Sequence, residues 1–126
     1  MKVLQVVEQA FRTLVEEQDD TILWLTQSMH GAGAELRVLL AGHCAYYAVQ
    51  KQRQPALALG NWQQSEPADL IRDLDSMLQK GIPIYVIREE LEERGLADLA
   101  IHPGVSVIRR ADLIDLYEQV DQIWQW

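Results

Sequence analysis

Short runs of apolar residues recur along the chain and predict the strands of a buried sheet. The most continuous run is Ile84-Tyr85-Val86-Ile87, which is β-branched or aromatic throughout. This composition suits a central strand of a parallel sheet that is covered on both faces. Strands are predicted at residues 2–8, 35–41, 83–87, 105–108 and 121–126, the last from its alternation of polar and apolar residues.

Apolar residues at helical spacing separate these runs and predict the helices. The clearest amphipathic stripe lies between a candidate cap at Ser65 and the terminator Gly81. Its apolar residues are Leu70, Ile71, Leu74, Met77 and Leu78. Helices are predicted at about residues 20–30, 45–49, 65–80, 88–95 and 112–120.

This order of elements predicts one α/β domain spanning residues 1–126. A crossover between parallel strands needs a helix and is right-handed, so helices should cover both faces of the sheet. Residues 8–17 fit neither period and are predicted to form a long loop. Residues 50–64, which include Pro55, Gly60 and Trp62, are predicted to be a surface excursion that is more mobile than its flanks.

Composition narrows the class of protein. At 126 residues, 48% apolar and 24% charged, the chain has the balance of a soluble globular protein, and neither a signal peptide nor a membrane span is visible. The formal charge of −8 disfavours binding to nucleic acids or anionic membranes and favours a protein partner with a basic face. The single cysteine excludes an internal disulfide and is typical of a cytoplasmic protein.

The familiar motifs for cofactors and hydrolysis are absent. No Gly-x-Gly-x-x-Gly follows the first strand, and neither a phosphate-binding Gly-x4-Gly-Lys motif nor a Gly-x-Ser-x-Gly elbow occurs. The three histidines are scattered, without a second ligand at metal-binding spacing. The sequence therefore predicts neither a cofactor nor a metal site.

One local constellation has a chemical mechanism, at Gly42-His43-Cys44. It falls where a strand ends and a helix begins, so Cys44 is expected near free backbone amides that favour a thiolate, beside a histidine that can add positive charge. Such a thiol could carry a persulfide as a catalytic residue. The competing interpretation, which we weight more heavily, is that Cys44 is a small buried residue beneath the helix.

The chemically privileged place in an open parallel sheet lies outside the carboxyl ends of its strands, here the Ile87/Arg88 step. Together with His43 and Tyr85, these residues form a candidate binding crevice. Tyr46 and Tyr47, with Trp62, are a candidate aromatic lip over a pocket.

Two surfaces are candidates for contacts with other proteins. Glu89, Glu90, Glu92 and Glu93 form either an acidic docking surface or, by default, a solvated helix face. Trp124 and Trp126 share one face of the last strand. An interface is the favoured role of Trp126, because a chain terminus seldom reaches the core, whereas Trp124 is equally suited to core packing.

A longer pattern resembles a known family. It comprises Tyr85-Val86-Ile87-Arg88-Glu89-Glu90-Leu91-Glu92-Glu93-Arg94-Gly95-Leu96, then Pro103-Gly104-Val105-Ser106-Val107-Ile108 and a closing Trp. These residues resemble the DsrE/DsrF/DsrH superfamily of sulfur-relay proteins, and its DsrH/TusB branch most closely. The stretches 3–7 and 38–40 resemble the family's first two strands, so the resemblance spans nearly the whole chain.

The resemblance implies a three-layer α/β/α sandwich with a five-stranded parallel sheet, in a subunit that forms homo-oligomers or hetero-oligomers. Family members pass persulfide sulfur between cysteines, in sulfur oxidation or toward thiolation of tRNA. The chain departs from the family at its thiols. The cysteine that ends the third strand in several branches aligns with Ile87, the DsrH cysteine falls near Thr21 or Ile22, and His43-Cys44 replaces the usual Asp-Gly.

Three hypotheses follow from these observations. The first is a non-catalytic assembly or binding subunit, similar to TusB, that shapes an oligomer around a partner's thiol. The second is a persulfide carrier or sulfurtransferase that uses Cys44. The third is a small-ligand-binding protein that uses the crevice near His43, Tyr85 and Arg88.

Overall fold

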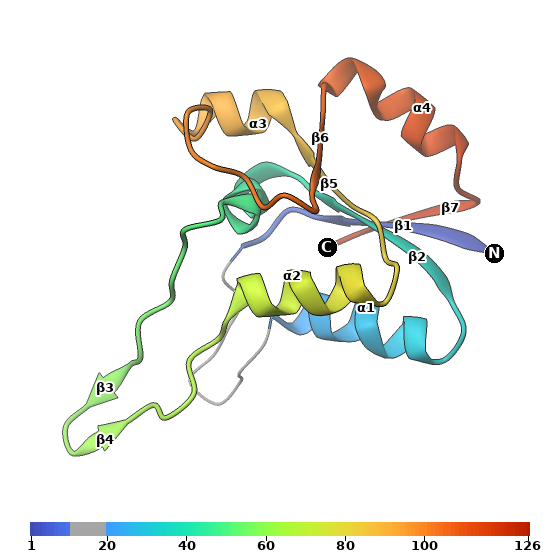
Figure 1. Cartoon of the computed structure of the whole chain (residues 1–126). Coiled ribbons are helices and arrows are strands. Elements are labelled where there is room, and N and C mark those ends of the chain that lie inside the picture. The colour runs from blue at the N-terminus through green and yellow to red at the C-terminus, as the bar shows by residue number, and fades with distance from the viewer. Residues whose placement is uncertain (11–19) are drawn as a thin grey trace.

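The computed structural model describes residues 1–10 and 20–126. Five parallel strands form its central sheet in the order β6-β5-β2-β1-β7 (Figure 1). The strands are β1 (Lys2–Val7), β2 (Glu35–Leu40), β5 (Ile84–Ile87), β6 (Ser106–Ile108) and β7 (Gln122–Gln125). The prediction of a five-stranded parallel sheet in an α/β fold is confirmed. The predicted loop at residues 8–17 lies largely outside the described residues.

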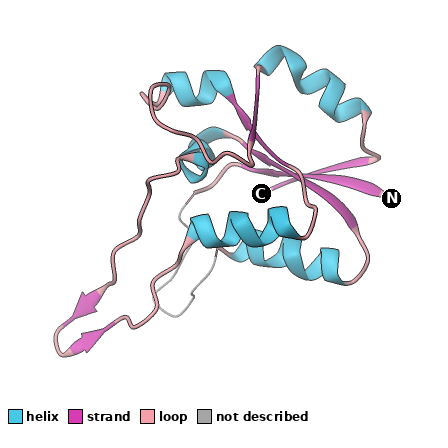
Figure 2. Cartoon of the chain, in the orientation of Figure 1, coloured by secondary structure: helices cyan, strands magenta, loops and turns pink. Residues whose placement is uncertain are grey.

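Helices cover both faces of this sheet (Figure 2). They are α1 (Thr21–Gly31), α2 (Leu70–Gln79), α3 (Arg88–Glu93) and α4 (Leu113–Glu118), with 3-10 helices η1 (Gly42–Ala48) and η2 (Arg110–Asp112). Helices α1 and α2 lie side by side below the sheet in Figure 1, and α4 lies above it. Helix α3 is placed at the carboxyl edge beside η1.

The burial of alternate strand residues divides the core into two parts. The larger part lies between the sheet and α1, α2 and η1, and it includes Val7, Val38 and Val86. The smaller part lies under α4 and brings Val6, Leu39 and Ile87 against it. Because successive strand side chains point to opposite faces, neighbouring residues of β5 belong to different cores.

The last strand joins the sheet at the edge opposite to β6. Strands β1, β2, β5 and β6 follow one another toward one edge, and α4 then returns the chain so that β7 pairs with β1 at the other edge. Trp126 is held there by backbone hydrogen bonds, from its N–H to the Val6 carbonyl (2.9 Å) and from the Glu8 N–H to its own carbonyl (3.0 Å).

A buried cap fixes the start of α1. The carboxylate of Asp20, which is fully buried, accepts hydrogen bonds from the backbone N–H groups of Ile22 (2.9 Å) and Leu23 (3.1 Å). Its second oxygen accepts the hydroxyl of Tyr47 at 2.7 Å. This network satisfies exposed donors at the helix N-terminus and ties α1 to η1.

Two predicted helices differ from the observed ones. Helix α2 begins at Leu70 instead of near Ser65, because Asp69 supplies the cap by accepting the N–H of Arg72 at 3.1 Å. The helix predicted at residues 45–49 is the 3-10 helix η1, which starts directly after Ala41.

The excursion at residues 50–64 contains structure that was not predicted. Strands β3 (Ala58–Leu59) and β4 (Trp62–Gln63) form an antiparallel hairpin around Gly60-Asn61. Gly60 adopts a φ of +58°, a conformation that glycine tolerates without steric cost. A two-residue Gly-Asn loop is a hairpin signal, and it was present in the sequence.

Across residues 1–10 and 20–126, no helix combines the length and the apolar character needed to cross a bilayer.

Candidate functional site

The carboxyl edge of the sheet brings together the segments that follow β2 and β5. These strands are neighbours, with Leu40 opposite Val86, so the turns after them lie next to each other. His43 lies in η1 after β2, Arg88 is the first residue of α3 after β5, and both side chains are exposed. Helix α3 follows β5 without an intervening residue, as the sequence pattern indicated.

The other two residues of the predicted crevice face the α4 side of the sheet. Ile87 is 4% exposed and belongs to the smaller core, against which Tyr85 also packs. Neither residue lines the cavity of the carboxyl edge that is described below. The structure therefore places His43 and Arg88 at the surface and Tyr85 and Ile87 in or against the core beneath α4.

Cys44 lies on the opposite side of the sheet from Ile87. Its side chain is fully buried in the larger core, and its backbone N–H donates to the Ala41 carbonyl at 3.0 Å. The adjacent His43 points outward and is exposed. This burial agrees with the interpretation of Cys44 as a small buried residue.

The acidic surface of α3 is partly neutralised by two arginines. Arg94 binds Glu90 at 2.5 Å, and Arg110 contacts Glu90 at 3.4 Å and Glu93 at 3.3 Å. The backbone N–H of Arg110 also donates to Glu89 at 2.7 Å. The hydrogen bond to Glu93 is the main cause that raises the pKa of Arg110 above its usual value. These contacts attach η2 to α3.

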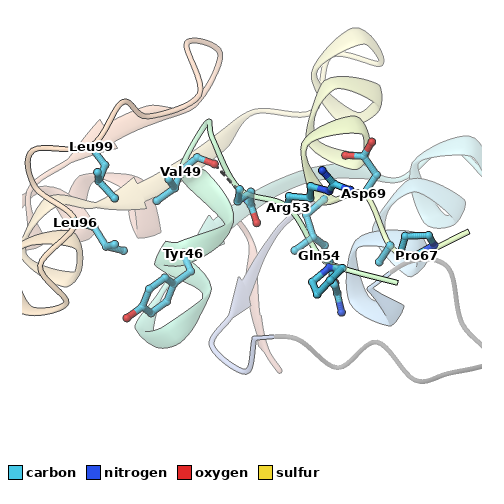
Figure 3. A pocket seen from close by; sticks show the side chains of 12 residues that line it. Tyr46, Val49, Arg53, Gln54, Pro67, Asp69, Leu96 and Leu99 are labelled. Atoms are coloured by element: carbon cyan, nitrogen blue, oxygen red, sulfur yellow. Dashed lines mark hydrogen bonds between the residues drawn. The ribbon is translucent and has the colours of Figure 1, made fainter. Parts of the chain in front are cut away.

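A cavity of about 810 Å³ opens at the carboxyl edge beside η1 (Figure 3). We call it the base pocket. Tyr46 lines it from η1, Val49 from the residue after η1, Leu70 from the start of α2, and Leu96 and Leu99 from the segment after α3. Arg53 and Asp69 add polar groups to its wall. Its lining is thus an apolar surface with a few polar groups, the usual character of a binding pocket.

The wall formed by Leu96 and Leu99 is held in place by backbone hydrogen bonds. The N–H of His102 donates to the Ala48 carbonyl at 2.8 Å, and the N–H of Gln50 donates to the Ala100 carbonyl at 2.9 Å. Both bonds join the end of η1 to the segment after α3. The base pocket therefore has a framework that does not depend on side-chain packing alone.

The two tyrosines predicted as an aromatic lip have separate roles. Tyr46 lines the base pocket and is 36% exposed, whereas Tyr47 is fully buried and bonds to Asp20. Trp62 does not line this pocket, since it lies on β4 of the hairpin, where it is 44% exposed.

A buried histidine outside the predicted set anchors the segment before β6. The Nε2 atom of His102 lies within hydrogen-bonding distance of the Asp75 carboxylate, and Nδ1 accepts the N–H of Gly104 at 3.0 Å. Because Nδ1 accepts, the proton sits on Nε2 in the neutral ring. This pair joins α2 to the turn at Pro103, and the only sequence signal for it was the His-Pro-Gly turn.

The terminal tryptophans differ in their surroundings. The indole N–H of Trp126 donates to the fully buried Gln5 side chain at 2.5 Å, and the ring packs against the larger core. The indole of Trp124 donates to Gln122 on its own strand at 3.0 Å. The predicted interface role of both residues stays a prediction.

Among residues 1–10 and 20–126, no group of three or more potential metal ligands is found.

No family model and no curated protein sequence matches the chain. Among solved structures, it is similar to the ychN protein from E. coli, with a TM-score of 0.75 and 15% sequence identity over 99% of this chain and 98% of that one. At this level of sequence identity the similarity shows the fold alone, which is DsrEFH-like.

Proposed function

We propose that this chain is a DsrE-like sulfur-relay protein that binds and assembles with other proteins, similar to the DsrH/TusB role, and does not carry sulfur on its own cysteine. One observation supports this role above the others. Cys44 is the only thiol of the chain and it is fully buried, while the strand-end position that holds a cysteine in related branches is the buried aliphatic Ile87.

Sulfur transfer sets a geometric requirement that Cys44 does not meet. A thiolate must reach the outer sulfur of a persulfide donor, form a new S–S bond and release the donor thiolate. The side chain of Cys44 has no exposed surface and is packed among apolar residues of η1 and the sheet. Reaction would therefore need η1 to leave the core.

Several large apolar side chains are available for protein contacts. Leu59 is 57% exposed, Ile114 is 67% exposed and Trp24 is 56% exposed, on the hairpin, α4 and α1 respectively. The formal charge of −8 favours a partner with basic groups.

A second candidate function is a persulfide carrier that uses Cys44. The observation in its favour is the position of the thiol at the carboxyl end of β2, one residue after the exposed His43. The 3-10 helix η1 has only seven residues, and hydrogen-bond geometry is poorer in such helices than in α-helices. Opening of this short segment would expose the sulfur.

Intact-mass measurement after incubation with inorganic polysulfide separates the two functions. For an assembly subunit, the mass of the folded chain stays unchanged, and modification requires unfolding. A gain of one sulfur on the folded wild-type chain, absent in Cys44→Ser, would establish the carrier instead. Ser is the matched replacement because it keeps the size of the side chain.

Assembly can be tested separately by mixing the chain with purified cysteine-bearing subunits of DsrE-like proteins. The expected result is a complex in which the partner's thiol accepts sulfur at an altered rate. Unchanged rates, with no complex detected by sedimentation, would argue against the assembly role in sulfur relay.

A further inference from the structure

The hairpin segment is an exposed part of the chain that lacks charge. We call residues 54–65 the arm. Its twelve residues contain no Asp, Glu, Lys or Arg, and ten of the twelve are exposed. Leu57 is 39% exposed, Leu59 is 57% exposed and Trp62 is 44% exposed. Charged residues make up 24% of the chain, so a surface segment of this length without any charge is unusual. Depletion of charged residues is typical of the core of a protein interface, so we expect another protein surface to cover the arm.

The arm projects from the body and has little support of its own. Figure 1 shows β3 and β4 extending away from the sheet and helices. Besides its strand pairing, the arm is closed by the N–H of Gln64 to the Leu57 carbonyl (2.8 Å) and by the N–H of Leu57 to the Gln64 side chain (3.2 Å). A two-stranded hairpin alone is marginally stable in water, so contacts with another surface would stabilise this one.

The base pocket provides a complementary surface on the same molecule. Its apolar wall is formed by Val49, Leu70, Leu96 and Leu99, and Leu99 is 49% exposed. It lies where the arm leaves and rejoins the body, since Gln54 and Pro67 also line it. The arm extends away from this place, so its own tip does not fill the pocket (Figure 1).

The distribution of charge indicates where a second copy of the chain can bind, and the fit between arm and pocket on one chain indicates that the partner is a second copy. Each copy has a formal charge of −8, so two copies repel over most of their surfaces. Residues 50–65 contain Lys51 and Arg53 and no acidic residue, which leaves a charge of −10 on the rest of the chain. The arm is thus the part of the surface that a second copy can approach with least repulsion.

The competing apolar surface on α4 has the opposite character. Ile114 and Tyr117 are exposed there, but Asp115 and Glu118 lie beside them in the helix. A contact between two copies through this surface would place like charges together, which costs free energy at an interface. The uncharged arm is therefore a better surface for self-association than the exposed face of α4.

We infer that two copies of the chain exchange arms, so that Leu59 and Trp62 of each copy enter the base pocket of the other. The exchange is symmetric, because each copy supplies one arm and one pocket, and it therefore forms a closed contact between two copies. This inference is independent of the sulfur-relay role, since it uses neither Cys44 nor the strand-end position.

Sedimentation of the purified full-length chain tests the exchange. The wild-type chain is expected to self-associate at micromolar concentration. Leu59→Asp and Leu99→Asp, which change the arm and the pocket respectively, should each weaken self-association at least about 30-fold, the effect expected of a central interface residue. Ile114→Asp changes a still more exposed apolar position on α4, so it is the control and should leave self-association unchanged.

Circular dichroism melting separates a lost interface from a lost fold, because both substituted side chains are exposed in the single chain. A wild-type chain that stays monomeric would overturn the inference. So would self-association that Leu59→Asp leaves intact, or that Ile114→Asp weakens as much as the arm variant does.

Disulfide trapping tests the contact directly, with Cys44→Ser as the background. A copy carrying Leu59→Cys is mixed with a copy carrying Leu99→Cys under mild oxidation. The expected product is a cross-linked pair in the mixture, in a yield well above that of either variant alone. Absence of this product while self-association persists would place the interface elsewhere and overturn the inference.

Discussion

Two neighbouring segments of similar apolar character meet opposite environments in this protein. In η1 (Gly42–Ala48), Cys44, Ala45, Tyr47 and Ala48 are all buried. In the arm, which begins six residues later, Leu57, Leu59 and Trp62 are exposed. The group with reactive chemistry is thus hidden, while the groups suited to contacts face outward. This difference is the physical basis for proposing a binding role over a catalytic one.

The largest expected effect concerns the accessibility of the buried thiol. Alkylation of Cys44 in the folded chain should be at least about 1,000-fold slower than in the unfolded chain, because exposure of a core residue requires opening close to global unfolding. Mass spectrometry after timed addition of iodoacetamide measures the rate. The matched control is Leu59→Cys in a Cys44→Ser chain, labelled at a protein concentration low enough to keep the chain monomeric, and its thiol should then react at the unfolded rate. Fast labelling of Cys44 in the folded chain would show that η1 is as accessible to reagents as the arm.

Replacing a leucine by alanine should lower the free energy of unfolding much more in the core than in the arm. Leu74→Ala should lower the free energy of unfolding by about 2–5 kcal/mol, because Leu74 is fully buried in the larger core. Leu59→Ala should change it by less than about 0.5 kcal/mol in the monomer, because that side chain is exposed. Urea unfolding measures both values. Equal losses would show that the arm packs on its own body.

The buried cap of α1 should contribute more to stability than the exposed cap of α2. Asp20→Ala should cost about 2–4 kcal/mol of unfolding free energy, since it removes both the cap of α1 and the buried hydrogen bond from the Tyr47 hydroxyl. Asp69→Ala at the exposed start of α2 should cost only about 1 kcal/mol. Thermal and urea unfolding provide the measurement. A cost for Asp20→Ala no larger than that for Asp69→Ala would mean that the buried network contributes little.

The smallest expected effect compares the last two tryptophans. Trp126→Phe should cost about 1–2 kcal/mol, because the buried Gln5 oxygen loses its donor. Trp124→Phe removes only a local bond to Gln122 and should cost less than about 0.5 kcal/mol. Urea unfolding at low protein concentration keeps any contribution from self-association out of the comparison. A reversed order would show that Trp124 has the greater role in the core.

The positions of the five strands of the central sheet and the class of fold could be predicted from the sequence, whereas the hairpin of β3 and β4 was missed. The run at residues 84–87 is apolar on both sides, and that pattern needs a sheet covered on both faces whatever the rest of the chain does. Apolar runs that alternate with amphipathic helices predict parallel strands joined by helical crossovers. Because such crossovers are right-handed, few topologies are possible. The start of α2 was missed because Ser65 and Asp69 are both residue types that cap helices well, and the sequence pattern does not distinguish them.

Tertiary structure alone decided what the candidate site contains. The pattern placed His43, Cys44, Tyr85 and Ile87 near one edge of the sheet, but it did not assign each side chain to a face. That assignment depends on the register of β2 and β5 and on how η1 packs after β2, which separates Cys44 from Ile87 by the sheet itself. The base pocket likewise joins η1, the start of α2 and the segment after α3, which only the folded chain brings together. Local periodicity is encoded within a few residues and can be read from the sequence, whereas burial and proximity depend on contacts between segments that are distant along it.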